Sequence, residues 1–222
     1  GLKSIDKIVV ITNKIKNYFT IKRIYFLGPD GAGKSTIIKD IVSSQIFKEY
    51  SGNNFQIWHT QPKLINNFKK LVKIKFKTRD LKTRNLKAHS SLKTILIFIY
   101  RLVDCFLGEL MLFLKNSNKI ILYDRGLPEF LYQPEFSKLP IIMKRYLLKK
   151  ISSDILFIAT ADLDVLLCRQ KDLTKTGIKK TLNNIFLLEK KIQFYNINYI
   201  WINTSKNNFC DFYFKNIKNF II

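Results

Sequence analysis

The sequence predicts one α/β domain in which a five-stranded parallel sheet lies between two layers of helices. Two observations lead to this fold class. Five short apolar segments are typical of buried strands, and segments with helical spacing of apolar residues alternate with them. With 222 residues, of which 47% are hydrophobic, the chain can bury a sizeable core. No internal repeat or Gly/Ser-rich linker interrupts it, which favours a single domain.

The expected elements follow one another along the chain. Strands are expected at residues 23–27, 54–59, 119–125, 154–160 and 199–203. Helices are expected at residues 4–19, directly after residue 36, at 90–115, 163–171 and 178–194, and after the last strand. The stretch 90–115 contains Arg101, Asp104 and Glu109, and these charges exclude a membrane span. We therefore expect a buried helix that lines a cleft there.

A phosphate-binding loop follows the first expected strand. Residues 28–36 fit the pattern G-x-x-x-x-G-K-[ST], because Gly28, Gly33, Lys34 and Ser35 stand at the required places. Glycines let backbone N–H groups surround phosphate oxygens, the following helix adds its positive dipole end, and the lysine adds a charge. The order strand, loop, helix supports binding of a nucleoside triphosphate. The expected nucleotide-binding residues of the loop are Gly28, Asp30, Gly31, Ala32, Gly33, Lys34, Ser35 and Thr36.

The net charge of +23 is the second strong signal. Between residues 63 and 87 ten Lys and Arg residues face only Asp80, and apolar residues are interleaved at helical spacing. A basic amphipathic insertion at about residues 62–88, together with an N-terminal amphipathic helix at residues 1–21, could meet acidic lipid headgroups, an anionic glycan or nucleic acid. The alternative is a solvated face in a protein of biased composition.

The compartment is expected to be the cytoplasm, with peripheral attachment to the inner face of the membrane as an option. The first residues show neither the apolar core nor the cleavage pattern of a signal peptide. Cys105, Cys168 and Cys210 are odd in number and far apart, which is typical of reduced thiols. The chain begins with glycine, so a trimmed or partial chain is expected.

The loop is followed by further motifs that together resemble a known family. Asp124 and Arg125 end the third expected strand, and residues 154–160 and 166–174 suit a strand, a helix and a lid. With these motifs the chain resembles the thymidylate kinase-like branch of the P-loop nucleoside-monophosphate kinases over about residues 22–207. The resemblance implies a three-layer P-loop NTPase fold, a kinase domain at residues 22–222 and a short lid at about residues 169–178.

Phosphoryl transfer needs positioning and charge neutralisation, and several residues suit these tasks. The expected catalytic residues are Lys34, Asp124, Arg125 and Arg169, and the expected magnesium ligands are Ser35 and Asp124. As an alternative, Asp124 forms only an ion pair with Arg125. Lys171 on the lid and Asn203 after the last strand are expected to contact ATP.

The expected acceptor-binding residues come from several segments: Asp30, His59, Gln61, Arg101, Asp104 and Arg125. The resemblance implies that Asp30 contacts a sugar hydroxyl of the acceptor, although it also suits a simple turn. Arg101 and Asp104 share one helix face, so they either bind the acceptor or form a private salt bridge.

The sequence leaves more than one phosphate acceptor open. The chain most closely resembles a subgroup found in bacterial surface-polysaccharide biosynthesis, in the loop at residues 28–31, the stretch 59–62 and the lid at residues 169–173. Gln61 and Gly126 depart from the thymidylate kinase pattern, which speaks against a thymidylate acceptor. The resemblance implies an ATP- and Mg²⁺-dependent kinase for a saccharide, such as a lipid-linked glycan. A nucleoside-monophosphate (thymidylate) kinase is the alternative. A further alternative is a polynucleotide kinase or a polyanion-binding module. Nucleic acid is the less favoured partner. A homodimer is a possible assembly.

Overall fold

The computed structural model describes residues 22–59, 88–115, 120–170 and 174–205. The N-terminal amphipathic helix, the basic insertion and the closing helix expected from the sequence lie outside these residues. None of the described helices combines the length and the apolarity that crossing a bilayer needs.

The centre of the molecule is one sheet of five parallel strands in the order β2-β3-β1-β4-β5. The strands are β1 (Lys22–Leu27), β2 (Phe55–His59), β3 (Ile120–Asp124), β4 (Ile155–Thr160) and β5 (Asn198–Asn203). Each expected strand is confirmed to within one residue at either end. β3 is buried along its whole length, as its unbroken apolar run predicts for a central strand.

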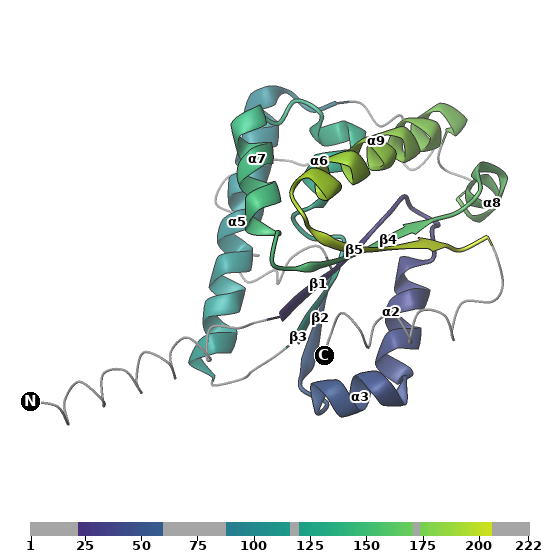
Figure 1. The fold of residues 1–222 in the computed structure, drawn as a ribbon. Helices are drawn as coiled ribbons and strands as arrows, with labels where there is room; N and C mark the ends of the chain where they lie inside the picture. The colour runs from purple at the N-terminus through teal and green to yellow at the C-terminus, as the bar shows by residue number, and fades with distance from the viewer. Residues whose placement is uncertain (1–21, 60–87, 116–119, 171–173, 206–222) are drawn as a thin grey trace, which may run out of the picture.

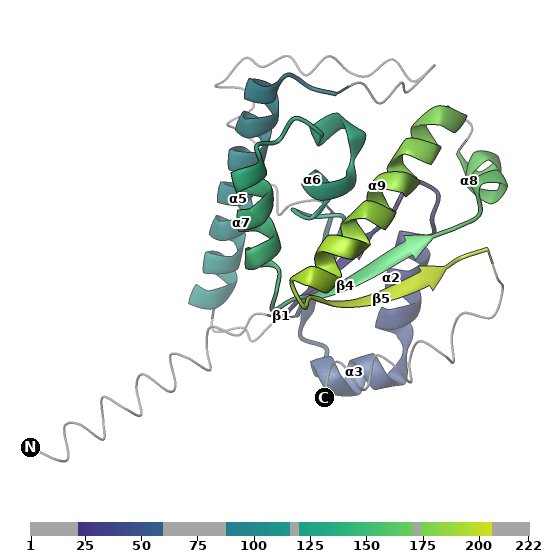
Figure 2. The ribbon, with the colours of Figure 1, turned by 45° about the horizontal axis from the view of Figure 1, so that its top comes forward.

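Helices cover both faces of this sheet, so the predicted three-layer architecture is confirmed (Figure 1). On one face lie α2 (Lys34–Ser43) and α3 (Gln45–Ser51), with α8 (Leu163–Arg169) beside them. On the other face lie α5 (Ser91–Leu114), α6 (Glu129–Tyr132), α7 (Ile141–Lys150) and α9 (Lys175–Phe194). Figure 2 shows α9 along β4 and β5 on one side and α2 on the opposite side.

The alternation of side chains along β1 shows how one strand supplies both halves of the core. Ile24 and Phe26 pack with the α2 layer, whereas Tyr25 and Leu27 pack with α5, α6 and α9. All four side chains are at most 2% exposed. The sheet therefore separates two apolar clusters.

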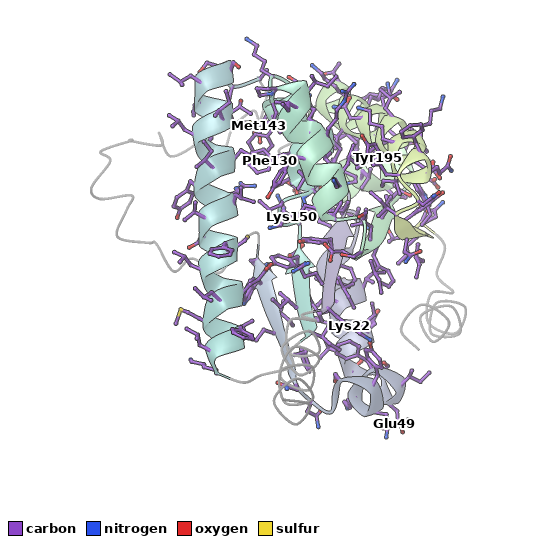
Figure 3. The ribbon with its side chains drawn as sticks, turned by 60° about the vertical axis from the view of Figure 1, so that its left-hand side comes forward. Lys22, Glu49, Phe130, Met143, Lys150 and Tyr195 are labelled. Atoms are coloured by element: carbon purple, nitrogen blue, oxygen red, sulfur yellow. The ribbon has the colours of Figure 1, made fainter. Side chains whose placement is uncertain are left out.

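The helix α5 differs from the expectation in one respect. It spans the predicted segment, but the expectation of a buried helix is wrong for one of its faces. Phe98, Cys105 and Leu112 face the core, whereas Leu92, Phe106 and other large apolar residues are exposed. Figure 3 shows α5 at the edge of the molecule, with no other described helix or strand over its outer side.

All five strands end at the same edge of the sheet, because they are parallel. After β1 the strand order continues to β3 and β2 on one side and to β4 and β5 on the other. A crevice forms at such a switch point, beyond the carboxyl ends of the strands, and it is where ligands bind in open α/β sheets. The loop at residues 28–33 lies at this point.

Candidate active site

Gly28 fixes the start of the phosphate-binding loop. Its φ is +142°, and a Cβ at this position would lie 2.1 Å from the carbonyl oxygen of Ala159 on β4. The Tyr132 hydroxyl lies 3.3 Å from both the nitrogen and the carbonyl oxygen of Gly28. Only glycine fits this backbone and this space. The loop is therefore held between β4 and α6.

The other end of the loop begins α2. Gly33 has a φ of +76° and precedes the first helical residue, Lys34. The N–H groups of the first helical turn point out of the helix end, where they can bind an anion.

Lys34 is 6% exposed, and its amino group donates to the carbonyl oxygens of Gly28 and Pro29 at 3.0 and 2.7 Å. Burial, and then the nearby charge of Arg125, lower the pKa of Lys34 to about 8. The amine is therefore still largely protonated at neutral pH. It is a desolvated positive charge held against the loop, which suits contact with phosphate oxygens.

One open cavity of about 790 Å³ brings most of the predicted nucleotide-binding and catalytic residues together. Its lining consists of Asp30, Gly31, Gly33, Lys34, Ser35, Thr36, Ile37, Asp40, Asp124, Arg125, Arg169, Gln170 and Thr204. Gly28 and Ala32 belong to the loop but do not line the cavity, and Ala32 is fully buried. Ile37, Asp40 and Gln170 were not among the expected site residues. Of these, Ile37 and Asp40 show a signal in the sequence, because they lie in the helix that the loop begins.

Asp124, the last residue of β3, contacts His59 at the end of β2 and Ser35 in the first turn of α2. Its Oδ2 lies 2.9 Å from His59 Nδ1 and accepts a hydrogen bond from the Ser35 hydroxyl at 3.4 Å. Its Oδ1 is buried and has no hydrogen-bond partner. A buried carboxylate oxygen without a partner, beside a hydroxyl, suits a hard cation such as Mg²⁺. Ser35 and Asp124 therefore fit the predicted magnesium site.

Arg125 follows Asp124 in a strained backbone conformation. Its φ is +89°, which is uncommon for a bulky side chain and costs on the order of 1–3 kcal/mol. Its backbone N–H donates to the carbonyl oxygen of Phe26 at 3.0 Å. The strained turn aims the guanidinium group at Asp30 in the loop, with which it forms an ion pair. The expected private ion pair between Asp124 and Arg125 is replaced by this contact.

Glu129 is a functional candidate that the sequence reasoning missed. Its side chain is 7% exposed and lies 2.9 Å from Arg101 Nη1 and 3.5 Å from Arg125 Nη1. A row of alternating charges thus runs Arg101, Glu129, Arg125, Asp30 into the cavity. The spacing of four residues from Arg125 to Glu129 is the only signal in the sequence.

The arrangement around Arg101 differs from both alternatives for this residue. Its ion pair is formed with Glu129, and its guanidinium group lies 5.1 and 5.3 Å from the ring centres of Phe130 and Phe136. Asp104 is fully buried, and neither residue lines the cavity. Arg101 reaches the acceptor side of the site only through Glu129.

Arg169, at the end of α8, contacts the loop directly. It donates to the Gly31 carbonyl at 3.2 Å and to the Thr204 hydroxyl and carbonyl oxygens at 3.0 and 3.2 Å. Asn203 lies next to Thr204 at the end of β5, and its side chain accepts a hydrogen bond from the Ser205 N–H.

Two further predicted residues, Gln61 and Lys171, lie outside the described residues. Residues 175–178 of the expected lid form the first turn of α9.

The absence of an aromatic residue after Asp124 and Arg125 has a structural cause. Gly126 has a φ of +69°, and a Cβ there would lie 2.8 Å from the ring of Tyr25. Tyr25 and Tyr123 are stacked beneath it with ring centres 4.6 Å apart. A larger residue at position 126 would have to displace this pair.

The fold and the loop define a P-loop α/β protein with a nucleotide-sized cavity at its switch point. No family model matches the chain, and no curated protein is similar to it in sequence. It is similar in structure to thymidylate kinase from Ehrlichia chaffeensis, with a TM-score of 0.54 and 18% identity over 90% of this chain and 98% of that one. It is also similar to thymidylate kinase from Candida albicans, with a TM-score of 0.53 and 14% identity over 90% of each chain. These comparisons confirm the predicted fold. They lend no support to the polysaccharide subgroup.

Proposed function

We propose that this protein is an ATP- and Mg²⁺-dependent kinase that phosphorylates a nucleoside monophosphate, with thymidylate as the first acceptor to test. The observation that carries the proposal is the buried Lys34 amine in the same cavity as the Ser35–Asp124 contact. The two solved structures named above are thymidylate kinases, which supports this acceptor class over the saccharide favoured by the sequence.

The residues of the cavity have different roles in phosphoryl transfer. The loop N–H groups and Lys34 bind the β- and γ-phosphates, and Arg169 neutralises charge that develops between donor and acceptor. Mg²⁺, when bound near Ser35 and Asp124, supplies further charge neutralisation on the phosphate oxygens. Arg125 lies at the acceptor side of the cavity and orients the attacking group.

A nucleoside monophosphate offers a phosphate oxygen as the attacking group. This oxygen is already ionised near neutral pH, so the transfer needs no strong general base. Arg125 is 35% exposed at the cavity and can turn from Asp30 to the phosphate of the acceptor. The Asp30 carboxylate can then accept a hydrogen bond from a sugar hydroxyl.

The test is the turnover of ATP by the full chain with a panel of nucleoside monophosphates, measured as ADP release and as formation of the nucleoside diphosphate. We expect turnover with at least one nucleoside monophosphate and none with Lys34→Ala. Turnover that persists in Lys34→Ala contradicts the proposal, and so does a panel that yields ADP without any phosphorylated acceptor.

A second candidate, a kinase for a saccharide hydroxyl, is favoured by one specific observation. Among the residues that the structure describes, the two arginines at the acceptor side, Arg125 and Arg101, are both paired with carboxylates, Asp30 and Glu129, which lowers their attraction for an acceptor phosphate. A neutral sugar suits such a surface. The same assay with hexoses and nucleosides in place of monophosphates separates the two candidates, because each predicts a different phosphorylated product.

The proposed partners that depend on the basic insertion stay predictions. Attachment to an anionic membrane surface, a lipid-linked glycan and binding of nucleic acid, including polynucleotide kinase activity, all rest on residues 62–88 of the sequence. Salt-dependent binding of an oligonucleotide or of anionic vesicles to the full chain, compared with a variant in which Lys69, Lys70 and Lys73 are neutralised, tests them.

A further inference from the structure

Tyr132, the last residue of α6, places a buried hydroxyl group against the phosphate-binding loop. The residue is 1% exposed, and its hydroxyl lies 3.3 Å from both the nitrogen and the carbonyl oxygen of Gly28. A phenol can donate one hydrogen bond and accept another, so this hydroxyl pairs with both backbone groups at once. Phenylalanine would fill nearly the same volume, so packing alone does not require the hydroxyl.

The surroundings of Tyr132 keep this hydroxyl in place and protonated. Asn184 on α9 donates a hydrogen bond to the Tyr132 carbonyl oxygen at 2.8 Å. The ring belongs to the apolar cluster that also contains residues of α5 and α9, and Figure 2 shows α6 between these two helices. Burial raises the pKa of Tyr132 well above its ordinary value, so the hydroxyl keeps its proton near neutral pH. It is therefore a fixed donor and acceptor at the start of the loop.

The carbonyl oxygen of Gly28 has a second side-chain donor. The Lys34 amine donates to this oxygen at 3.0 Å and to the carbonyl oxygen of Pro29 at 2.7 Å. Phosphate oxygens compete with these carbonyl oxygens for the amine, because a charged acceptor binds an ammonium group more strongly than a neutral one. When the amine moves to a phosphate, the buried Gly28 carbonyl depends on the Tyr132 hydroxyl for a side-chain donor.

The opposite end of α6 contacts the acceptor side of the cavity. Glu129, the first residue of α6, pairs with Arg125, and Arg125 pairs with Asp30, two residues after Gly28. Together with the hydroxyl of Tyr132, these contacts form a closed ring through α6 and the loop. The ring connects the start of the loop to the arginine that faces the acceptor.

From these contacts we propose that Tyr132 is a positioning residue for phosphoryl transfer, whose hydroxyl holds Gly28 in place while the Lys34 amine moves from the Gly28 carbonyl oxygen to the phosphates of the nucleotide. The inference rests on the proposed function, because it takes Lys34 to bind the phosphates of ATP. Without the hydroxyl, the Gly28 carbonyl loses its side-chain donors when the nucleotide binds, which lowers the affinity. The start of the loop can then shift relative to Arg125, and a displacement of about 1 Å between reacting groups can cost about 100-fold in rate.

The first experiment needs no nucleotide and therefore gives a result even if no nucleoside monophosphate is phosphorylated. Urea unfolding compares the full chain with Tyr132→Phe, Lys34→Met and the double variant. Either side chain can supply the donor to Gly28, so Tyr132→Phe should lower the folding equilibrium constant about fivefold more in the Lys34→Met background than in the wild type. Additive effects of the two changes overturn the proposal.

The matched control for this experiment is Tyr199→Phe. The Tyr199 hydroxyl on β5 also forms two hydrogen bonds, with Gln193 at 3.0 Å and Glu189 at 3.1 Å, but it does not contact the loop. Tyr199→Phe and Lys34→Met should therefore be additive. The same excess loss with Tyr199→Phe would mean that the coupling does not pass through Gly28, and this contradicts the proposal.

The second experiment measures nucleotide affinity and turnover. In a titration calorimeter with Mg²⁺ and a non-hydrolysable ATP analogue, Tyr132→Phe should bind about fivefold more weakly than the wild type, whereas Tyr199→Phe should not differ. With an acceptor that the wild type phosphorylates, kcat of Tyr132→Phe should fall by a larger factor than the acceptor KM rises. A hydroxyl with a purely structural role lowers Tm and leaves affinity and kcat unchanged, and that result refutes the positioning role. A wild type that does not bind the analogue contradicts the proposed function itself.

Discussion

Replacing Glu129 by glutamine tests whether the row of charges at the acceptor side stabilises the fold. The glutamine keeps the volume and one hydrogen bond but removes the charge between Arg101 and Arg125. Removing one member of a buried ion pair costs about 3–5 kcal/mol, because the other member stays buried without compensation. Arg101 is 18% exposed and the amide can still accept a hydrogen bond worth about 1 kcal/mol, so we expect a loss of about 2–3 kcal/mol.

Urea unfolding followed by circular dichroism measures this loss as a change in the free energy of unfolding. Glu49→Gln is the control, because Glu49 accepts an exposed hydrogen bond from Gln45 on α3 and its loss should cost less than about 0.5 kcal/mol. Arg101→Gln should cost less in the Glu129→Gln background than in the wild type, since the pair is already broken. If Glu129→Gln is as mild as the control, or if the two changes are additive, the charge row has no stabilising role.

Three further predictions concern the loop, the sheet and the strained turn. Lys34→Ala should abolish ATP binding in a titration calorimeter while Tm stays close to the wild-type value, and retained binding contradicts the role of the buried amine. Burial raises the pKa of Asp154 to about 6, so its contribution to stability is present at low pH and is lost as the pH rises from about 4 to about 6, by about 2–3 kcal/mol. The difference between wild-type and Asp154→Asn unfolding free energies across this range should show that slope, and a flat difference refutes it. Gly126→Ala should destabilise by at least about 1 kcal/mol in urea unfolding, because of its φ and the contact with Tyr25, and a neutral effect shows that Tyr25 moves freely.

The elements that were predicted correctly carry their signal locally. Each strand is a short apolar run, and the phosphate-binding loop is defined by the conformational needs of its glycines. The placement of Lys34, Ser35 and Asp124 around one cavity follows from the parallel arrangement of the strands, since their carboxyl ends meet at one edge.

The parts that were missed depend on tertiary contacts. Glu129 reaches Arg101 only because the turn at Gly126 starts α6 directly beneath α5. α5 is apolar on nearly all sides, so periodicity could not show which face turns outward. The helices α6 and α7 were not predicted either. α6 has only four residues, which is too short to show a helical period, and of the apolar residues of α7 only Leu147 and Leu148 are buried.

The clamped start of the phosphate-binding loop has a thermodynamic consequence. Gly28 packs against β4 without room for a Cβ, and Tyr132 holds both of its backbone polar groups. The phosphate-binding loop is therefore preorganised, and few residues lose conformational freedom when a triphosphate binds. Binding should cost little conformational entropy, and the affinity should depend mainly on the charge that the ligand brings.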